Sequence, residues 1–182
     1  VDKGFEGVVI KSVSDDSFYQ PGKRGFLWVK WKREYIKGIQ DTFDLAVIGL
    51  FYGKGRRSDT FGALLCAVRN SKNSMYESFT KVGTGFTDKD FEELRVLLQK
   101  HRVKKKPSQV AVSKDMVPDE YVQPSIVIEV IGAEITKSPH HMAGRDGSKK
   151  GYALRFPRFV RKRPDKEPCQ ATTVKEITSM VK

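Results

Sequence analysis

The chain has 182 residues, which suits one domain of ordinary size or one domain with part of another. Its hydrophobic content of 38% supports a packed core and excludes a chain that is disordered throughout. With 34 Lys and Arg residues against 22 Asp and Glu, the net charge of +12 favours nucleic acid, an anionic membrane surface or a phosphorylated ligand as the partner.

Other features of the sequence narrow the cellular setting. No apolar run approaches the ~18 residues of a membrane span, and no signal-peptide pattern opens the chain. Cys66 and Cys169 have neither metal-site spacing nor the number needed for a disulfide framework, so a reducing, intracellular compartment is expected. Because the chain begins at Val1 and enters a strand almost at once, we expect a fragment of a longer protein.

The first two predicted strands form a hairpin. They cover residues 5–11 and 27–33, and turn residues separate them, which predicts antiparallel pairing. Alternation along the second strand places Trp28, Lys30 and Lys32 on one face. Two ammonium groups on one face suit a polyanion such as a triphosphate, but lysines on an edge strand also serve simply to prevent aggregation. The residues alone leave both interpretations open.

The rest of the chain predicts a mainly β barrel and a short tail helix. Residues 35–42 form a polar linker. Apolar runs then predict strands, and Thr87 with Asp90 predicts the start of a helix that ends near residues 100–103. The strands are expected at residues 43–52, 61–69, 76–82, 126–135 and 152–163. Three strands, one helix and two strands is the order of an OB-fold barrel, a fold that commonly binds nucleic acid. Thr173 and Glu176 form a capping-box pattern before a narrow apolar stripe, which predicts a terminal helix that docks on another surface.

The densest cationic stretch covers residues 155–166, with six basic side chains and one acidic side chain. Arginines interleaved with phenylalanines suit nucleic acid, because guanidinium groups bind phosphates while rings stack or wedge into a groove. Alternatively, Phe156, Phe159 and Val160 belong to the barrel core and the arginines are only solvated. Pro157 favours an edge or bulge position over a central strand.

Three other groups of residues are weaker candidates. Glu6 is the only acidic residue of the first strand, where a carboxylate is either an exposed edge residue or needs a cation. The loop at residues 53–58 lacks the order of a phosphate-binding loop, and we expect a turn that touches a phosphate backbone through Arg56 or Arg57. The basic run at residues 100–106 is expected to be solvated, and His140-His141 has no spaced partner ligands for a metal.

Taken together, three strings resemble motifs IV, V and VI of ATP-dependent DNA ligases. They are Phe-Glu-Gly-Val-Val-Ile-Lys at residues 5–11, Trp-Val-Lys-Trp-Lys at residues 28–32, and Leu-Arg-Phe-Pro-Arg-Phe-Val-Arg-Lys-Arg-Pro-Asp-Lys at residues 154–166. The likeness covers essentially the whole chain and is closest to the archaeal and eukaryotic replicative type. It implies the end of an adenylation (nucleotidyltransferase) domain with a linker at residues 1–40, a five-stranded OB-fold domain with one inserted helix at residues 41–166, and a tail helix at residues 167–182.

The resemblance also implies site residues. Glu6 would bind Mg²⁺ near the nucleotide, Arg24 would lie near ATP, and Lys30 and Lys32 would face the α-phosphate. Around the pyrophosphate leaving group, the resemblance implies Arg155, Arg161, Asp165 and Lys166. For contact with DNA, the cationic stretch at residues 155–166 supplies Phe156, Arg158 and Arg163. The glycine-containing loop at residues 53–58 supplies Arg56 and Arg57.

The implied activity is the sealing of nicks with a 3′-hydroxyl and a 5′-phosphate in duplex DNA, during replication, repair and recombination. ATP and Mg²⁺ would be the cofactors, and nicked DNA, the missing N-terminal part and a sliding clamp the expected partners. The family's nucleophile is the lysine of a Lys-x-Asp-Gly motif. The nearest string here is Gly144-Arg145-Asp146-Gly147, so the chain is not expected to adenylate itself. The location implied is the cytoplasm of an archaeon or the nucleus of a eukaryote.

Two alternatives remain. One is a stand-alone OB-fold module that binds nucleic acid without catalysis. The other is a different member of the nucleotidyltransferase superfamily, an RNA capping enzyme or an RNA ligase.

Overall fold

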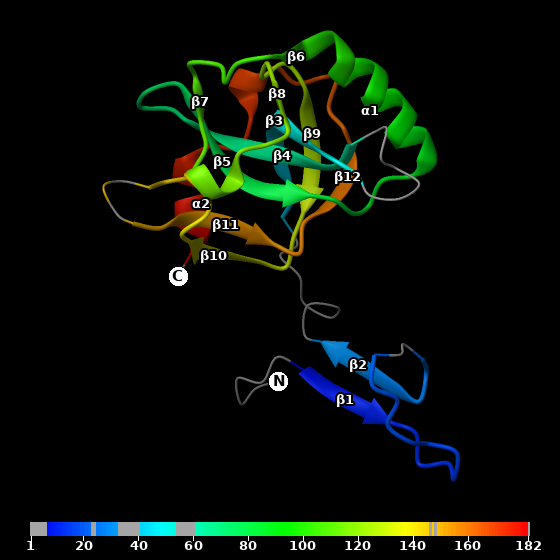
Figure 1. The fold of residues 1–182 in the computed structure, drawn as a ribbon. Coiled ribbons are helices and arrows are strands. Elements are labelled where there is room, and N and C mark those ends of the chain that lie inside the picture. Colours follow the sequence, from blue (N-terminus) through cyan, green and yellow to red (C-terminus); the bar gives the residue numbers. More distant parts are fainter. Residues whose placement is uncertain are drawn as a thin grey trace. The chain divides into compact units, whose positions relative to one another are not determined.

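The computed structural model describes residues 7–22, 25–32, 41–53, 61–145, 147 and 149–181, except for the side chain of Lys32. The chain divides into two compact units, Val1–Gly38 and Ile39–Lys182 (Figure 1).

The first unit contains the predicted hairpin. Strands β1 (Gly7–Lys11) and β2 (Trp28–Lys32) pair in antiparallel register, with Lys11 opposite Trp28 and Val9 opposite Lys30. Residues directly opposite each other share a face, so Lys11, Trp28 and Lys30 lie on the same side of the hairpin. The ammonium of Lys11 lies 4.3 Å from the centre of the Trp28 ring. The hairpin and the alternation predicted for its second strand are confirmed.

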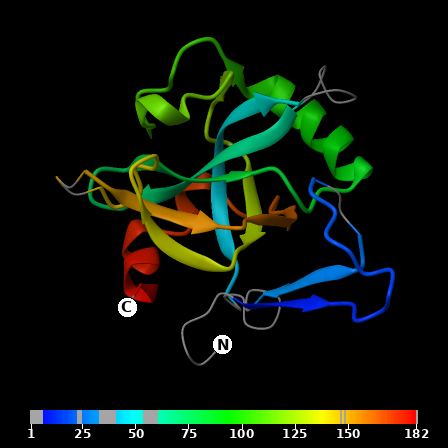
Figure 2. The same ribbon diagram turned by 60° about the horizontal axis from the view of Figure 1, so that its bottom comes forward.

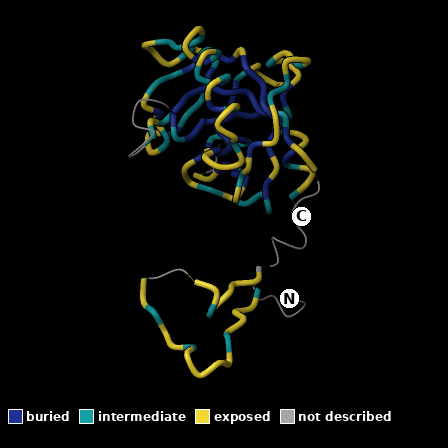
Figure 3. The backbone as a smooth tube through the Cα atoms, turned by 90° about the vertical axis from the view of Figure 1, so that its right-hand side faces the viewer, coloured by how far each residue is buried: buried dark blue, intermediate teal, exposed yellow. Residues whose placement is uncertain are grey.

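The hairpin exposes apolar side chains on both faces, and its tube is mostly coloured as exposed in Figure 3. About half or more of each of four β1 and β2 side chains is accessible to solvent: Val8, Val9, Ile10 and Trp31. A two-stranded hairpin is marginally stable alone in water. Its stability therefore depends on apolar partners for these faces.

The second unit is a curled sheet. Its main path is β12-β9-β3-β4-β5-β7, antiparallel except for the parallel pair β5–β7. The bounds are β3 (Phe43–Tyr52), β4 (Phe61–Asn70), β5 (Met75–Val82), β7 (Val110–Ala111), β9 (Val127–Ile131) and β12 (Arg158–Lys162). Strands β10 (Glu134–Ser138) and β11 (Gly151–Arg155) form a separate antiparallel pair, and β6 (Arg102–Val103) pairs with β8 (Glu120–Val122). Figure 2 shows how the strands curl around a common interior.

Each of the last two predicted strands is in fact two strands. The run at residues 126–135 breaks after β9, because at Gly132 the backbone passes so close to Leu154 that a Cβ would lie 2.5 Å from its side chain. The run at residues 152–163 breaks at Phe156, whose φ of 52° is left-handed, and at Pro157, which has no N–H to donate. The prediction of continuous strands was wrong at these two points. The position of Pro157 outside both strands agrees with the expectation that it does not occupy a central strand.

Within the described residues, two α-helices and two short 3-10 helices, η3 (Lys114–Met116) and η4 (Pro168–Gln170), complete the unit, and both α-helices begin at the predicted capping boxes. Helix α1 (Asp88–His101) is capped by Thr87 with Asp90, and α2 (Val174–Met180) by Thr173 with Glu176. Helix α1 buries three side chains against the barrel: Phe91, Leu94 and Leu98. In α2, Ile177 is fully buried in the same core cluster, so the terminal helix docks on the barrel. Among the described residues, no helix is long and apolar enough to cross a membrane.

The basic run after α1 is only partly solvated, which corrects the prediction for residues 100–106. The Arg102 side chain is 32% exposed and forms an ion pair of 3.0 Å with Glu120. Lys106 donates a hydrogen bond of 3.1 Å to the carbonyl of Val110. Both side chains therefore help to fasten the segment between α1 and β8, which the charge pattern alone did not reveal.

Candidate nucleotide and nucleic-acid site

The segment at residues 155–166, which contains β12, carries most of the predicted site, and a bulge in β12 determines which of the strand's side chains face outwards. Phe159 pairs with Val130 and Arg161 pairs with Glu129, so Val160 is an extra residue in the ladder. A bulge of this kind bends a strand and re-aims its side chains. Phe159 is therefore buried in the core, while Val160 and Arg161 both face solvent.

The bulge resolves the two interpretations of the Phe-rich stretch. Phe159 belongs to the core, where its ring stacks on Phe86 at a centroid distance of 4.6 Å. Phe156 and Val160 are 45% and 44% exposed. The core interpretation was right for one residue and wrong for the other two.

A row of charged side chains crosses three neighbouring strands beside that core. Asp44 of β3 pairs with Glu129 of β9, and Glu129 pairs with Arg161 of β12. The side chains of Asp44 and Glu129 are only 13% and 10% exposed. Two largely buried carboxylates next to each other require cations nearby.

Three cations of β12 and the following turn meet this requirement. Arg161 Nε donates to Glu129 Oε2 at 2.6 Å, and Arg163 Nη1 donates to Asp44 Oδ1 at 2.8 Å. Lys166 Nζ donates to Asp44 Oδ2 at 2.5 Å. Arg163 also binds Asp165, with 2.8 Å between Nη2 and Oδ2. These three carboxylates and three cations form an ion cluster whose formal charges cancel.

Hydrogen bonds within the ion cluster keep two of its carboxylates, Glu129 and Asp165, ionised. Hydrogen bonding by Arg163, above all other causes, lowers the pKa of Asp165 from 3.8 to about 2. Burial acts to raise the pKa of Glu129, but hydrogen bonds from Arg161 and Thr42 outweigh it, and this pKa also falls below its ordinary value. The hydrogen bond to Asp165 in turn raises the pKa of Arg163. Glu129, Asp165 and Arg163 are therefore charged at neutral pH.

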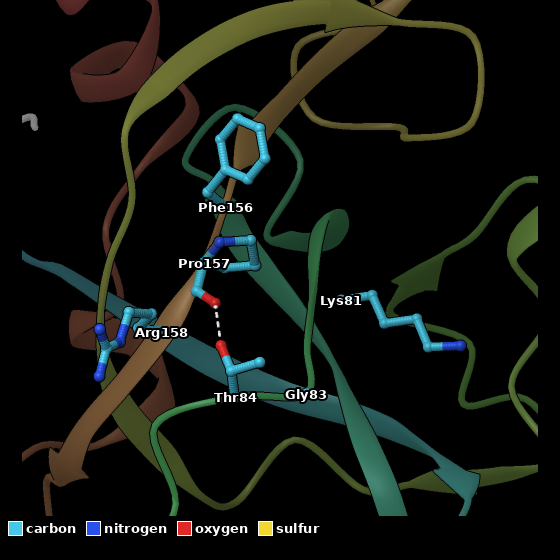
Figure 4. Close-up of a pocket in the computed structure, with 6 residues that line it drawn as sticks. All are labelled: Lys81, Gly83, Thr84, Phe156, Pro157 and Arg158. Carbon is cyan, nitrogen blue, oxygen red and sulfur yellow. Dashed lines mark hydrogen bonds between the residues drawn. The ribbon is translucent and has the colours of Figure 1, made fainter. Parts of the chain in front are cut away.

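An open pocket of about 420 Å³ lies at the start of β12 (Figure 4). Phe156, Pro157 and Arg158 form one side of it, and the loop after β5 forms the other. Thr84 Oγ1 donates to the carbonyl of Pro157 at 2.9 Å, and the amide of Phe159 donates to the carbonyl of Thr84 at the same distance. The loop therefore fixes the backbone that presents Phe156.

Two basic side chains near the pocket are held by aromatic rings. The guanidinium carbon of Arg155 lies 5.0 Å from the centre of the Phe156 ring, and Nη1 of Arg155 lies 3.7 Å from Glu134. Lys81 points away from the other lining residues in Figure 4, and its ammonium lies 3.6 Å from the centre of the Phe51 ring. Arg158 is exposed and, within the described part of the chain, forms no ion pair. It is the most available cation of this pocket.

The predicted site residues thus fall into distinct groups. Arg155, Phe156 and Arg158 lie at or beside the pocket, whereas Arg161, Asp165 and Lys166 meet in the ion cluster. Lys30 is exposed on the hairpin of the other unit. Four further predicted site residues lie outside the described part of the chain: Glu6, Arg24, Arg56 and Arg57. The side chain of Lys32 lies outside it as well. The roles predicted for all these residues stay predictions.

Arg163, predicted to contact DNA, is largely enclosed by the ion cluster. Its side chain is 14% exposed, and its guanidinium forms ion pairs with Asp44 and Asp165. Its role in DNA binding stays a prediction, but the observed contacts are structural.

Sequence reasoning did not single out Asp44, Glu129 or Thr84. Asp44 stands at the start of an otherwise apolar strand, and Glu129 interrupts another, which is a signal for a buried charge that needs a partner. The identity of that partner required the strand register. Thr84 carries no such signal, because a threonine between glycines is common in turns.

Comparison with known proteins identifies the family. The model of the ATP dependent DNA ligase C terminal region matches residues 57–166. The chain belongs to this family. The ligase chain is 54% identical over 180 residues to DNA ligase 1 of Methanosarcina acetivorans, covering 99% of this chain and 31% of that protein. It is 49% identical over 184 residues to the DNA ligase of Hyperthermus butylicus, covering 100% of this chain and 30% of that protein. The ligase chain therefore spans just under a third of the length of these relatives.

The fold agrees with that membership. The ligase domain of LigD from M. tuberculosis superposes with a TM-score of 0.57 and 27% identity, covering 94% of this ligase chain and 48% of that chain. The resemblance inferred from the three motif strings is confirmed, together with the mainly β fold.

Proposed function

We propose that this chain is the C-terminal part of an ATP-dependent DNA ligase that seals 3′-hydroxyl/5′-phosphate nicks in duplex DNA. The observation that carries the proposal is the arrangement of β12. Its bulge leaves Arg161 exposed in the same ion cluster as Lys166, while Phe156 and Arg158 lie at the pocket. One segment thus offers cations for a polyphosphate and an aromatic ring with an arginine for a nucleic acid.

The first step would be adenylation of the ligase. A lysine supplied by another part of the protein attacks the α-phosphate of ATP, an N–P bond forms, the bond to the β-phosphate breaks, and pyrophosphate leaves. Lys30 and Lys32 would stabilise charge at the α-phosphate, with Arg24 near the nucleotide. Glu6 would hold Mg²⁺, which offsets phosphate charge when bound. Arg155, Arg161, Asp165 and Lys166 would orient the pyrophosphate.

The later steps would transfer AMP to the 5′-phosphate of the nick, and the 3′-hydroxyl would then displace AMP to form the phosphodiester. For these steps Phe156 and Arg158 would contact the duplex, together with Arg56, Arg57 and Arg163. An exposed ring next to an arginine suits a minor groove, where apolar side chains wedge between bases and arginines follow the phosphates. A sliding clamp stays a predicted partner.

The test uses the isolated chain and a chimaera in which it replaces the matching third of the M. acetivorans DNA ligase 1. With labelled ATP and Mg²⁺, the isolated chain should acquire no AMP, because it has no Lys-x-Asp-Gly nucleophile. The chimaera should form enzyme–AMP and seal a nicked duplex. Lys30→Ala should slow adenylation of the chimaera by at least about a hundredfold, since a charge-stabilising group is worth that much in rate.

Lys89→Ala is the matched control, because Lys89 is an exposed lysine on α1 whose partner is Glu93. It should leave adenylation unchanged. Adenylation of the isolated chain, or a chimaera that binds nicked DNA but never seals it, would contradict the proposal. The second outcome would favour a barrel that only binds nucleic acid, a function that the pocket beside Phe156 also supports.

A further inference from the structure

Arg161 is held by only one of its three nitrogens. Its Nε donates to Glu129, and 61% of the side chain is exposed. Within the described residues, its terminal Nη groups donate no hydrogen bond. An arginine fork binds phosphate oxygens in pairs, so the free end of the guanidinium is the part that suits a phosphate.

Lys166 is held in a similar way by Asp44. Its ammonium donates to Asp44 Oδ2 at 2.5 Å, and the side chain keeps 31% exposure. An ammonium has three donors, so one bond to a carboxylate leaves others for a ligand. Asp44 itself is fixed by Thr172. The amide of Asp44 donates to Thr172 Oγ1 at 3.0 Å, and the amide of Thr172 donates to the Asp44 carbonyl at 2.8 Å.

Arg163 connects the two carboxylates that hold these cations. Its Nη1 lies 2.8 Å from Asp44 Oδ1 and 3.6 Å from Glu129 Oε2, and the side chain is 14% exposed. The buried arginine therefore sets the spacing of Asp44 and Glu129. These two carboxylates in turn bind the more exposed cations, Lys166 and Arg161.

We propose that Asp44 and Glu129 are positioning residues that hold Lys166 and Arg161 ready for the pyrophosphate that leaves during adenylation. This inference rests on the proposed function. Neither carboxylate would touch the nucleotide, because both are largely buried. They act by orientation: a side chain already fixed in the correct geometry loses no rotamer freedom when the phosphate arrives.

Orientation has a signature that simple loss of stability lacks. Glu129→Gln and Asp44→Asn keep the shape of each side chain but remove its charge. In the chimaera each should slow enzyme–AMP formation by about tenfold, while sealing of a nick that already carries AMP changes by under about twofold. The KM for ATP should not rise, because the substitutions leave the surface more positive.

A double-mutant cycle identifies the partner through which Glu129 acts. In an Arg161→Met background, Glu129→Gln should have almost no further effect on adenylation, since the side chain that it orients is gone. Glu93→Gln is the control. Glu93 pairs with Lys162, the neighbour of Arg161 on β12. If the loss of any ion pair on this strand slowed adenylation, Glu93→Gln would slow it as well.

Thermal unfolding of each variant separates orientation from misfolding. The proposal is overturned if the Gln and Asn variants slow both steps equally, or if Glu129→Gln acts as strongly in the Arg161→Met background as in the unsubstituted protein. If the proposed function itself is wrong, the result is different: the unsubstituted chimaera will not seal nicks at all.

Discussion

At the scale of single residues, Phe156 has the least ordinary conformation. Its φ of 52° lies in the left-handed region, which costs a non-glycine residue roughly 1–2 kcal/mol. The ring is nevertheless 45% exposed, so burial of the side chain does not explain the strain. Strain of this kind is often retained at functional sites. The observation agrees with the proposed contact between Phe156 and DNA.

Asp165 leads to a prediction of pH dependence. Its pKa is lowered from 3.8 to about 2 in the folded chain, mainly by Arg163. A depressed carboxylate pKa contributes stability that is present above the unfolded pKa and is lost as the pH falls through the folded pKa. The stability difference between the unsubstituted chain and Asp165→Asn should therefore be constant from pH 7 to about 4 and shrink between about pH 4 and 2. Urea unfolding across that range measures it, and a difference that stays constant down to pH 2 would contradict the assignment.

At the scale of elements, the start of β12 depends on the loop that follows β5. Gly85 has a φ of +95°, and a Cβ there would lie 2.4 Å from the carbonyl oxygen of Phe159. Only glycine fits both the dihedral angle and the close approach. The loop thus determines where β12 begins and how Phe156 is presented.

Alanine substitution of two glycines separates these two effects. Gly147 also has a positive φ, of +66°, but nothing lies within 4 Å of its Cβ position. Gly147→Ala should cost about 1 to 2 kcal/mol from the dihedral angle alone. Gly85→Ala should cost about 1 to 3 kcal/mol more, because the backbone of Phe159 has to move. Denaturant unfolding of both variants measures the difference, and equal costs would show that the contact is unimportant.

At the scale of the whole molecule, only some of the cations behind the net charge of +12 are free of carboxylate partners and available to a ligand. The ion cluster and the pairs Lys162–Glu93 and Arg102–Glu120 neutralise several cations internally. Arg158 is exposed, and within the described residues no carboxylate neutralises it. Under the proposed function, the cations that contact DNA should therefore be a small subset of the total.

The salt dependence of DNA binding tests which cations contact DNA. Affinity for a nicked duplex should fall steeply with salt, and Arg158→Ala should reduce the slope of log K against log salt by about 1, since one phosphate contact is lost. Arg95→Ala is the control, because Arg95 lies on α1 and binds Glu92 at 2.9 Å. Fluorescence anisotropy at several salt concentrations measures both slopes. Equal changes for the two variants would mean that only net charge matters.

The sequence by itself determined the elements whose signals are local. The period of apolar residues located β3 and α1, and the capping boxes at Thr87 and Thr173 marked both helix starts. These signals suffice because an N-cap and its partner lie three residues apart, and a strand or helix face repeats every few residues. The three motif strings determined the family in the same local way.

Only the tertiary structure decided how distant residues combine. The bulge at Val160 comes from the register of β12 against β9, and it directs Arg161 outwards instead of into the core. The break at Gly132 depends on Leu154, which approaches from elsewhere in the chain. Asp44 meets Lys166 across 122 positions of sequence. Such contacts leave no periodic trace, because the energy of a buried charge depends on which partner the fold brings to it.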